Sequence, residues 1–199
     1  MKEFRIKPIG IVKNKADKEV LKYANEDIKL DFEVAQSRGA DLITSEIIVE
    51  DKYADCLDGI EDFSHLVILF WTHKTPNSAR RIKKVHPAGL KNMPIKGIFA
   101  TRSPVRPNPI AKTTVKLIKR KGKSLLVEGL DAIDNTPVVD IKPHLPFYDS
   151  PLNVKLADWM YSLMEELKNL IETSDNNSQP NPYSVNPRSH PCLNRDKEK

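Results

Sequence analysis

An arginine- and proline-rich block contains the residues that stand out as an anion-binding group. Residues 99–110 read Phe-Ala-Thr-Arg-Ser-Pro-Val-Arg-Pro-Asn-Pro-Ile. The prolines fix their own φ angles and restrict the residues before them, so we expect a stiff loop. This loop carries Arg102, Arg106 and Asn108, and guanidinium groups bind carboxylates and phosphates or stack on bases. The alternative is a proline-rich corner whose arginines only cap carbonyl oxygens.

A second block places carboxylates among apolar residues. Residues 129–143 read Gly-Leu-Asp-Ala-Ile-Asp-Asn-Thr-Pro-Val-Val-Asp-Ile-Lys-Pro and include Asp131, Asp134 and Asp140. Carboxylates accept hydrogen bonds from ribose hydroxyls and amino groups, and they offset the positive charge of a sulfonium. Residues 134–137 also have the composition of a good turn, which is the structural alternative for Asp134.

The third segment, residues 59–74, contains a markedly apolar run, Leu66–Trp71. Because this run is apolar at both parities, it predicts a central strand that is covered on both faces. His65 precedes the run, and a histidine there is more often structural than catalytic. His73 and Lys74 follow the run, at a strand end where binding residues commonly gather.

Short strands must position these segments. We expect strands at 4–12, 28–32, 43–50, 66–71, 95–100, 115–120, 125–128 and 138–141, with a hairpin turn at 121–123. Short helical segments are expected at 17–23 and 52–57, and apolar residues three and four apart predict an amphipathic helix over 153–172. Many short strands with closely spaced turn signals favour a β-barrel or a β-sandwich.

Length and composition predict one domain followed by a helix and a tail. We place the domain at 1–150, the helix at 151–172 and a disordered tail at 173–199, where polar residues and prolines dominate. No apolar run is long enough to cross a bilayer and no signal core follows the N-terminal charges, so we expect a cytoplasmic protein. Two cysteines and five scattered histidines predict no structural metal.

The charge of the chain permits an anionic partner. The formal net charge is +5, and each local basic cluster taken alone is ordinarily a solvated turn. Several clusters beside one suspected site favour phosphate contact. They are Arg80–Lys84, Lys119–Lys123 and the group of Arg102, Arg106 and Lys112. The glycine-rich signatures of common nucleotide folds and the usual hydrolase motifs are absent.

Four segments together resemble the TsaA/TrmO-type tRNA methyltransferases, and the resemblance covers roughly residues 4 to 150. They are Pro8-Ile9-Gly10-Ile11, residues 59–66, residues 99–110 and residues 134–143. The resemblance implies a mainly β, single-sheeted small β-barrel that binds S-adenosylmethionine, often as a homodimer. It also implies methylation of the exocyclic amine of threonylcarbamoyl-adenosine, which lies next to the anticodon of a tRNA.

The resemblance also implies site residues. Carried over by motif, the cofactor contacts are His73, Lys74, Arg102, Lys112 and the turn of Asp131, Ala132, Ile133 and Asp134. For the RNA substrate we predict contacts from Arg106, Asn108, Arg80, Arg81 and Lys142. No general base is assigned, because methyl transfer from a sulfonium depends mainly on positioning.

The chain departs from the family pattern in two places. Lys112 stands where the family usually has an apolar residue, and the bacterial Pro-Arg-Gln segment has no counterpart between Asn14 and Leu42. These departures motivate two alternatives. One is a non-catalytic module that binds S-adenosylmethionine or RNA, and the other is a methyltransferase for a small-molecule acceptor.

Overall fold

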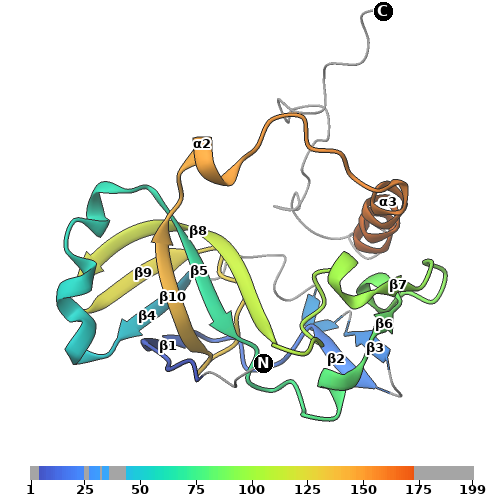
Figure 1. The fold of residues 1–199 in the computed structure, drawn as a ribbon, viewed down its shortest axis with the longest axis horizontal. Coiled ribbons are helices and arrows are strands. Elements are labelled where there is room, and N and C mark those ends of the chain that lie inside the picture. Colours follow the sequence, from blue (N-terminus) through green and yellow to red (C-terminus); the bar gives the residue numbers. More distant parts are fainter. Residues whose placement is uncertain (1–4, 25–26, 32, 36–43, 173–199) are drawn as a thin grey trace, which may run out of the picture.

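The strands of the chain close into a barrel (Figure 1). The computed structural model describes residues 5–24, 27–31, 33–35 and 44–172. The barrel order is β1-β10-β5-β8-β9-β4, and every neighbouring pair is antiparallel. The strands are β1 Gly10–Lys13, β4 Thr44–Val49, β5 His65–Trp71, β8 Ile110–Lys121, β9 Ser124–Glu128 and β10 Pro137–Pro143. The mainly β, single-sheeted barrel that the sequence predicts is confirmed.

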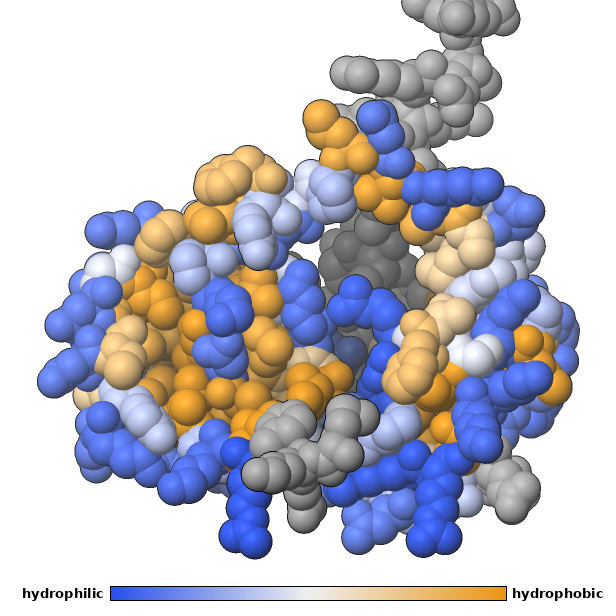
Figure 2. Space-filling view, in the orientation of Figure 1, coloured by the Kyte–Doolittle hydropathy of each residue, from blue (hydrophilic) through white to orange (hydrophobic). Residues whose placement is uncertain are grey.

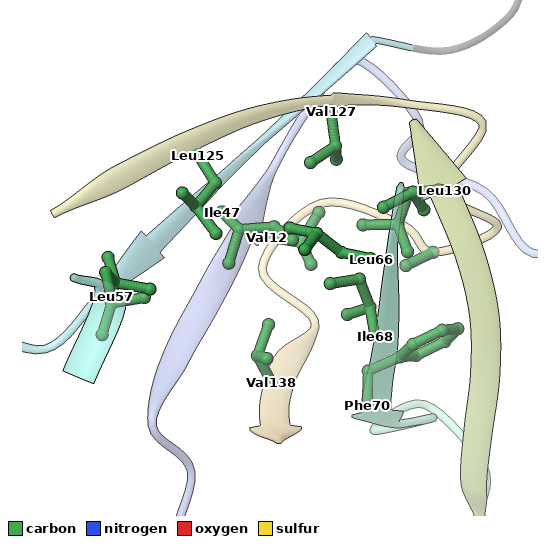
Figure 3. Close-up of a cluster of buried hydrophobic side chains, with 13 residues drawn as sticks. Val12, Ile47, Leu57, Leu66, Ile68, Phe70, Leu125, Val127, Leu130 and Val138 are labelled. Carbon is green, nitrogen blue, oxygen red and sulfur yellow. The ribbon is translucent and has the colours of Figure 1, made fainter. Parts of the chain in front are cut away.

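The barrel interior is filled by alternate residues of these strands (Figure 3). Val12, Ile47, Leu66, Ile68 and Leu125 are fully buried. Side chains alternate between core and surface in β4 and β9, whereas in β5 Val67 is buried as well. Burial of a side chain of this size contributes about 1.5–3 kcal/mol, so this cluster fixes the register of the sheet. The ends of β5 and its neighbours, where the motif segments lie, are therefore held by a rigid core.

A second lobe lies beside the barrel and has its own small core. It contains the hairpin of β2 Leu21–Ala24 and β3 Asp27–Leu30, and the short pair β6 Lys84–Val85 and β7 Lys96–Gly97. The 3₁₀ turns η3 Ala79–Arg81, η4 Pro87–Gly89 and η5 Ile98–Ala100 connect them, whereas η1 Asp51–Leu57 and η2 Ile60–Asp62 belong to the barrel side. The buried core consists of Ile28, Ala79, Val85, Ile98 and Val105. Val105 belongs to the arginine–proline block, so the second lobe holds that block in place.

A buried carboxylate and a glycine join the hairpin of this lobe to η4. Asp27 Oδ2 accepts hydrogen bonds from His86 Nδ1 at 2.6 Å and Lys91 Nζ at 2.5 Å, and its Oδ1 accepts from the backbone amide of His86. Burial alone would raise the pKa of Asp27, but these hydrogen bonds outweigh it and lower the pKa to about 2. Gly89 has a φ of +73°, and a Cβ there would lie 2.7 Å from the carbonyl oxygen of Ile28, so only glycine fits.

The C-terminal elements leave the barrel and reach the second lobe. The short helix α2 Pro146–Asp149 follows β10, and the helix α3 Asp158–Glu172 follows it (Figure 1). Lys96 of β7 and residues 155–159 line a shared hollow, which places the start of α3 beside the second lobe. Asn153 has a φ of +60°, which is incompatible with a helix, so α3 begins at Asp158 rather than at 153.

Several sequence predictions need correction. The predicted helical segment at 17–23 is wrong, because Leu21–Ala24 pairs as a strand with β3 and cross-strand pairing overrides local preference. Of the predicted strand 95–100 only Lys96–Gly97 pairs, and η5 follows. The first strand begins at Gly10, and β8 begins at Ile110 rather than at 115.

The other expected elements within the described residues are confirmed. The strands near 28–32, 43–50, 66–71, 125–128 and 138–141 are present, as are the hairpin at 121–123 and a short helix over 52–57, here a 3₁₀ turn. The expected disordered tail at 173–199 lies outside the described residues. Within the described ranges, no helix has both the length and the apolar character that a membrane crossing requires.

Candidate functional site

Three loops meet at the end of the barrel where β5 finishes. They are the loop after β1, residues 14–18, the loop after β5, residues 72–75, and the loop before β10, residues 129–136. The backbone amide of Asp134 donates to the carbonyl of Ala16 at 2.6 Å, and that of Asn135 donates to Val12 at 2.8 Å. Thr136 Oγ1 lies 3.4 Å from His73 Nδ1. We call this meeting point the loop junction.

Asn14 is the residue that ties the loop junction together, and the sequence analysis did not select it. Its Nδ2 donates to the carbonyl of Ala132 and to Ser45 Oγ, both at 2.9 Å, and its amide donates to Asp134 Oδ1 at 3.2 Å. Its own Oδ1 accepts from the amide of Ala16 at 2.9 Å. An asparagine directly after a strand is the only sequence signal, and it is a weak one.

The turn of Asp131, Ala132, Ile133 and Asp134, which we call the acidic turn, presents carboxylates beside buried apolar side chains. Asp134 is half-buried, and its Oδ2 accepts a hydrogen bond from Asn135 Nδ2 at 2.7 Å. Ala132 and Ile133 are buried, whereas Asp131 is exposed. Asn135 adopts a φ of +62°, which confirms that this segment is a turn. Asp134 can therefore belong to a structural turn and still present its carboxylate to a ligand.

His73 and Lys74 lie in the loop junction, as the sequence predicts from their position after β5. Burial lowers the pKa of His73, and the positive charge of Lys74 lowers it further, so the imidazole is neutral at pH 7. Lys74 Nζ donates to the carbonyl of Asp17 at 3.0 Å and remains exposed. The junction therefore combines a neutral histidine with an accessible ammonium group.

The arginine–proline block packs against the same loop. The amide of Thr72 donates to the carbonyl of Pro109 at 2.8 Å, which joins the end of β5 to the start of β8. A hollow of about 280 Å³ lies next to this contact, between the hairpin of the second lobe and the block. It is lined by Leu21, Tyr23, Lys74, Thr75, Pro104 and Val105, among others.

The two arginines of the block do cap carbonyl oxygens, as the structural alternative predicts. Arg102 Nη2 donates to the carbonyl of Lys112 at 2.9 Å, and Arg106 Nη1 donates to Thr101 at 3.2 Å and to Ser103 at 3.3 Å. Arg102 nevertheless remains exposed. The carbonyl of Lys112 uses one of the five N–H donors of its guanidinium group, and the others are available to a ligand. Capping therefore orients these side chains without burying Arg102.

The remaining predicted residues divide into two groups. Lys112 is exposed on β8 opposite Leu69, next to Arg102, and Asn108 is exposed in the block. Arg80 stacks over the ring of Trp71, with its guanidinium carbon 5.1 Å from the ring centre, while Arg81 beside it is exposed. All four lie on the segments that border the end of β5.

Lys142 is not brought to the loop junction. It pairs with Val67 on β5, and four residues of strand correspond to about 13 Å between Val67 and Trp71. Its Nζ contacts Asp140 Oδ2 at 2.6 Å, and this hydrogen bond raises the pKa of Lys142. His65 lies at the opposite end of β5 from the junction, which agrees with a structural role. In the described part of the chain, no group of three or more His, Cys, Asp or Glu side chains is arranged to hold a metal ion.

Comparison with known proteins agrees with this geometry. Residues 32–150 match the model of the tRNA-methyltransferase O N-terminal domain. A probable S-adenosyl-L-methionine-binding protein of Methanothermobacter thermautotrophicus is 35% identical over 153 residues, which cover 74% of this chain and 95% of the relative. The human tRNA (adenine(37)-N6)-methyltransferase is 43% identical over 121 residues, which cover 60% of this chain but only 27% of the human protein.

Solved structures show the same fold. The crystal structure of TrmO from Pseudomonas aeruginosa superposes with a TM-score of 0.56 at 24% identity, over 79% of this chain and 64% of that one. The chain therefore spans less than two thirds of this neighbour, although it spans nearly the whole archaeal relative. The chain belongs to the tRNA-methyltransferase O N-terminal domain family.

Proposed function

We propose that the protein transfers a methyl group from S-adenosylmethionine to the N6 atom of an adenosine in tRNA. The observation that carries this proposal is the loop junction. There the acidic turn, the loop after β5 and the arginine–proline block come together, although they are far apart in the chain. The mammalian relatives named tRNA (adenine(37)-N6)-methyltransferase and the archaeal relatives named S-adenosyl-L-methionine-binding proteins support it.

The residues of the loop junction fit S-adenosylmethionine chemically. This molecule has a cationic sulfonium, an amino group, a carboxylate, ribose hydroxyls and a flat apolar base. The carboxylates of Asp131 and Asp134 suit the cationic and hydroxyl groups, and Lys74 and Arg102 suit the carboxylate. The buried apolar part of the acidic turn suits the base. We propose that these residues, with His73 and Lys112, hold the cofactor.

The contribution of this chain to the reaction is positioning. When bound, S-adenosylmethionine would supply a methyl group activated by its sulfonium. The bond from the acceptor nitrogen to the methyl carbon would form as the carbon–sulfur bond breaks, with the sulfur leaving as a thioether and the nitrogen losing its proton to water. The carbonyl of Lys112 fixes Arg102, and Asn14 fixes the acidic turn, before any ligand binds. Such pre-organisation lowers the entropy lost in aligning the two substrates.

We propose threonylcarbamoyl-adenosine next to the anticodon as the acceptor nucleoside. Its threonyl carboxylate and the neighbouring phosphates are anions, and the guanidinium groups at the end of β5 suit both. Arg106, Asn108, Arg80 and Arg81 are the residues we assign to this task. Lys142 lies farther along β10 and pairs with Asp140, so it is not part of the proposal.

We further propose that the protein acts as a homodimer in the cytoplasm. A broad apolar area covers the barrel face shown in Figure 2. Ile11 of β1 and Ile6 before it are 38% and 45% exposed, and Phe147 and Tyr148 of α2 are 85% and 81% exposed. Apolar area of this extent favours association with a second copy. Analytical ultracentrifugation at micromolar concentration is expected to give the dimer mass.

The reaction is tested with labelled S-adenosylmethionine and tRNA that carries threonylcarbamoyl-adenosine, followed by digestion and mass spectrometry of the nucleosides. A methylated threonylcarbamoyl-adenosine is the expected product. A label only on unmodified adenosine would retain the tRNA methyltransferase and reject the acceptor. Cofactor binding without transfer would instead favour the non-catalytic module, and transfer only to small molecules would favour the other alternative.

A further inference from the structure

One long segment of the chain lacks acidic residues altogether. The chain has 32 Lys and Arg and 27 Asp and Glu, yet residues 63–127 contain 15 of the basic residues and none of the acidic ones. The segment includes β5, most of the second lobe, the arginine–proline block and β8. A surface built from it attracts polyanions over its whole length, because no carboxylate of its own opposes them.

The exposed cations of this segment lie on both lobes. They include Arg81, Lys83 and Lys84 on the second lobe, Arg102 in the arginine–proline block, and Lys112 and Lys116 on β8. At the far end of β8, Arg120 is bound by Asp58 at 3.0 Å and by Glu61 at 3.1 Å, whereas Lys119 and Lys121 beside it are exposed. The cationic surface therefore extends from the second lobe along β8.

An exposed aromatic ring lies within this surface. Phe99 of η5 is 77% exposed, although its neighbour Ile98 is buried in the core of the second lobe. The backbone around it is fixed on both sides. The amide of Ile98 donates to the carbonyl of Lys83 at 2.9 Å, and Thr101 Oγ1 donates back to the carbonyl of Ile98 at 2.9 Å. The ring is thus presented to solvent by a rigid support.

Arg106 of the arginine–proline block contacts this ring, and Lys84 lies on the strand that pairs with the residues just before it. The guanidinium carbon of Arg106 lies 5.9 Å from the ring centre of Phe99, within the range of a cation–π contact. Lys84 is the register partner of Gly97, two residues before Phe99. A flat ring held among cations matches an unpaired base, which offers a π-face and carries phosphates on either side.

We propose that Phe99 is a platform on which an unpaired base of the RNA substrate stacks, while the surrounding cations contact its phosphates. The identity of the partner as RNA rests on the proposed function, but the platform itself concerns binding and not methyl transfer. A protein partner would not require an acid-free surface, so the charge pattern favours RNA over a second copy of this chain at Phe99.

The test compares Phe99→Ala with Tyr161→Ala, because Tyr161 is also an exposed aromatic residue but lies on α3, outside the acid-free segment. Affinity is measured by fluorescence anisotropy with a stem–loop RNA that has an unpaired loop and with a fully paired duplex. Phe99→Ala is expected to weaken stem–loop binding by about 10-fold and to leave duplex binding unchanged, since the bases of a duplex are already stacked. Tyr161→Ala is expected to change neither affinity.

Further variants keep the result interpretable. Phe99→Trp should retain the affinity, and its fluorescence should be quenched by the stem–loop but not by the duplex. Phe99→Leu, which stays apolar but lacks a π-face, should bind like the alanine variant. Equal affinity of Phe99→Ala and the wild type for the stem–loop would overturn the platform. It would also be overturned if Phe99→Ala sedimented as a monomer and the wild type as a dimer, because Phe99 would then contact a second copy of the chain.

The two proposals fail separately. If the platform is wrong, Phe99→Ala binds the stem–loop normally while methylation of tRNA persists. If the methyltransferase proposal is wrong, the wild type methylates nothing while Phe99 still determines the affinity for unpaired RNA. Binding of S-adenosylmethionine to Phe99→Ala, measured by calorimetry, should equal that of the wild type and serves as the control for folding.

Discussion

At the level of single residues, the arginines of the arginine–proline block combine a structural contact with an open surface. Arg102 donates one hydrogen bond to the carbonyl of Lys112 yet stays exposed, so its remaining N–H groups point where a ligand can reach them. The sequence presented carbonyl capping and anion binding as alternatives. In the structure the two are compatible, because the capped guanidinium of Arg102 stays exposed and would lose little further entropy on binding a ligand.

Arg102→Ala is expected to lower kcat/KM for tRNA methylation by about 100-fold, the usual effect of removing one positioned donor. The exposed position of Arg102 predicts an unchanged melting temperature, which differential scanning calorimetry would check. Arg102→Lys keeps the charge but not the fork, and it should restore only part of the activity. Full activity of the alanine variant would remove Arg102 from the site.

The titration of His73 is a second prediction at this scale. Its pKa is expected to lie below the ordinary histidine value, and Lys74→Ala should raise it by removing a positive neighbour. The unfolded chain binds a proton at His73 more readily than the folded protein does, so the contribution of the neutral His73 ring to stability is fully present at neutral pH. It is lost as the pH falls below the ordinary value. Titration of the imidazole signals by NMR measures both effects, and a normal pKa would contradict the burial of the ring.

At the level of elements, the barrel strands and β3 of the second lobe could be predicted, whereas the rest of the second lobe could not. Strands such as β4 and β9 contain five or six residues, and their runs of β-branched and apolar residues are visible in the sequence. By contrast, β6 and β7 are pairs of only two residues, held by a core that includes Val105 from a distant segment. A two-residue strand has no period, so only the folded chain reveals it.

The same reasoning explains what could be predicted of the site. His73, Lys74 and the arginine–proline block were selected because they follow strands or have an unusual composition. The contribution of Asn14 depends on hydrogen bonds to Ala132 and Asp134, which are 118 and 120 residues away. Contacts over such separations leave no local pattern, and the same holds for the distance of Lys142 from the loop junction.

The joint between the hairpin of the second lobe and η4 gives a prediction at this scale. Asp27→Asn removes a carboxylate that is held by His86 and Lys91, and it should lower the free energy of unfolding by about 2 kcal/mol at pH 7. Because the pKa of Asp27 is lowered to about 2, its contribution is present above about pH 4 and is lost as the pH falls toward 2. The difference between wild type and variant should therefore vanish in acid.

Chemical denaturation between pH 2 and pH 7 measures this difference. Asp31→Asn is the matched control, because Asp31 also pairs with a lysine, Lys22, but at the surface. The control should have little effect at any pH. An Asp27→Asn variant as stable as the wild type at pH 7 would show that the contacts of Asp27 do not support the second lobe.

At the level of the whole molecule, charge is divided along the chain in a way that the net value of +5 conceals. The acidic residues all lie before residue 63 or after residue 127. Long-range attraction of an RNA is therefore directed to one surface that spans both lobes, rather than to the protein as a whole. The sequence contains three separate basic clusters, and two of them, Arg80–Lys84 and the group of Arg102, Arg106 and Lys112, border the end of β5 in the fold.

Salt dependence tests this division. The logarithm of the affinity for tRNA should fall linearly with the logarithm of the salt concentration. Lys84→Ala and Lys116→Ala, one on each lobe, should each reduce the slope by about 1. Lys29→Ala, an exposed lysine of β3 outside the acid-free segment, should leave the slope unchanged. Equal slopes for all the variants would show that the surface does not contact the RNA backbone.

The closure of the barrel also determines when the protein can fold during its synthesis. β1 pairs with β10 through Gly10 with Val138 and Ile11 with Pro137. This pairing cannot form until the ribosome has added the residues of β10, more than a hundred residues after β1. Until then β1 and β5 each lack a partner strand, and such open edges pair readily with other chains. A nascent chain that stalls before Pro137 therefore cannot close the barrel, and it depends on a chaperone to keep its open strand edges from pairing with other chains.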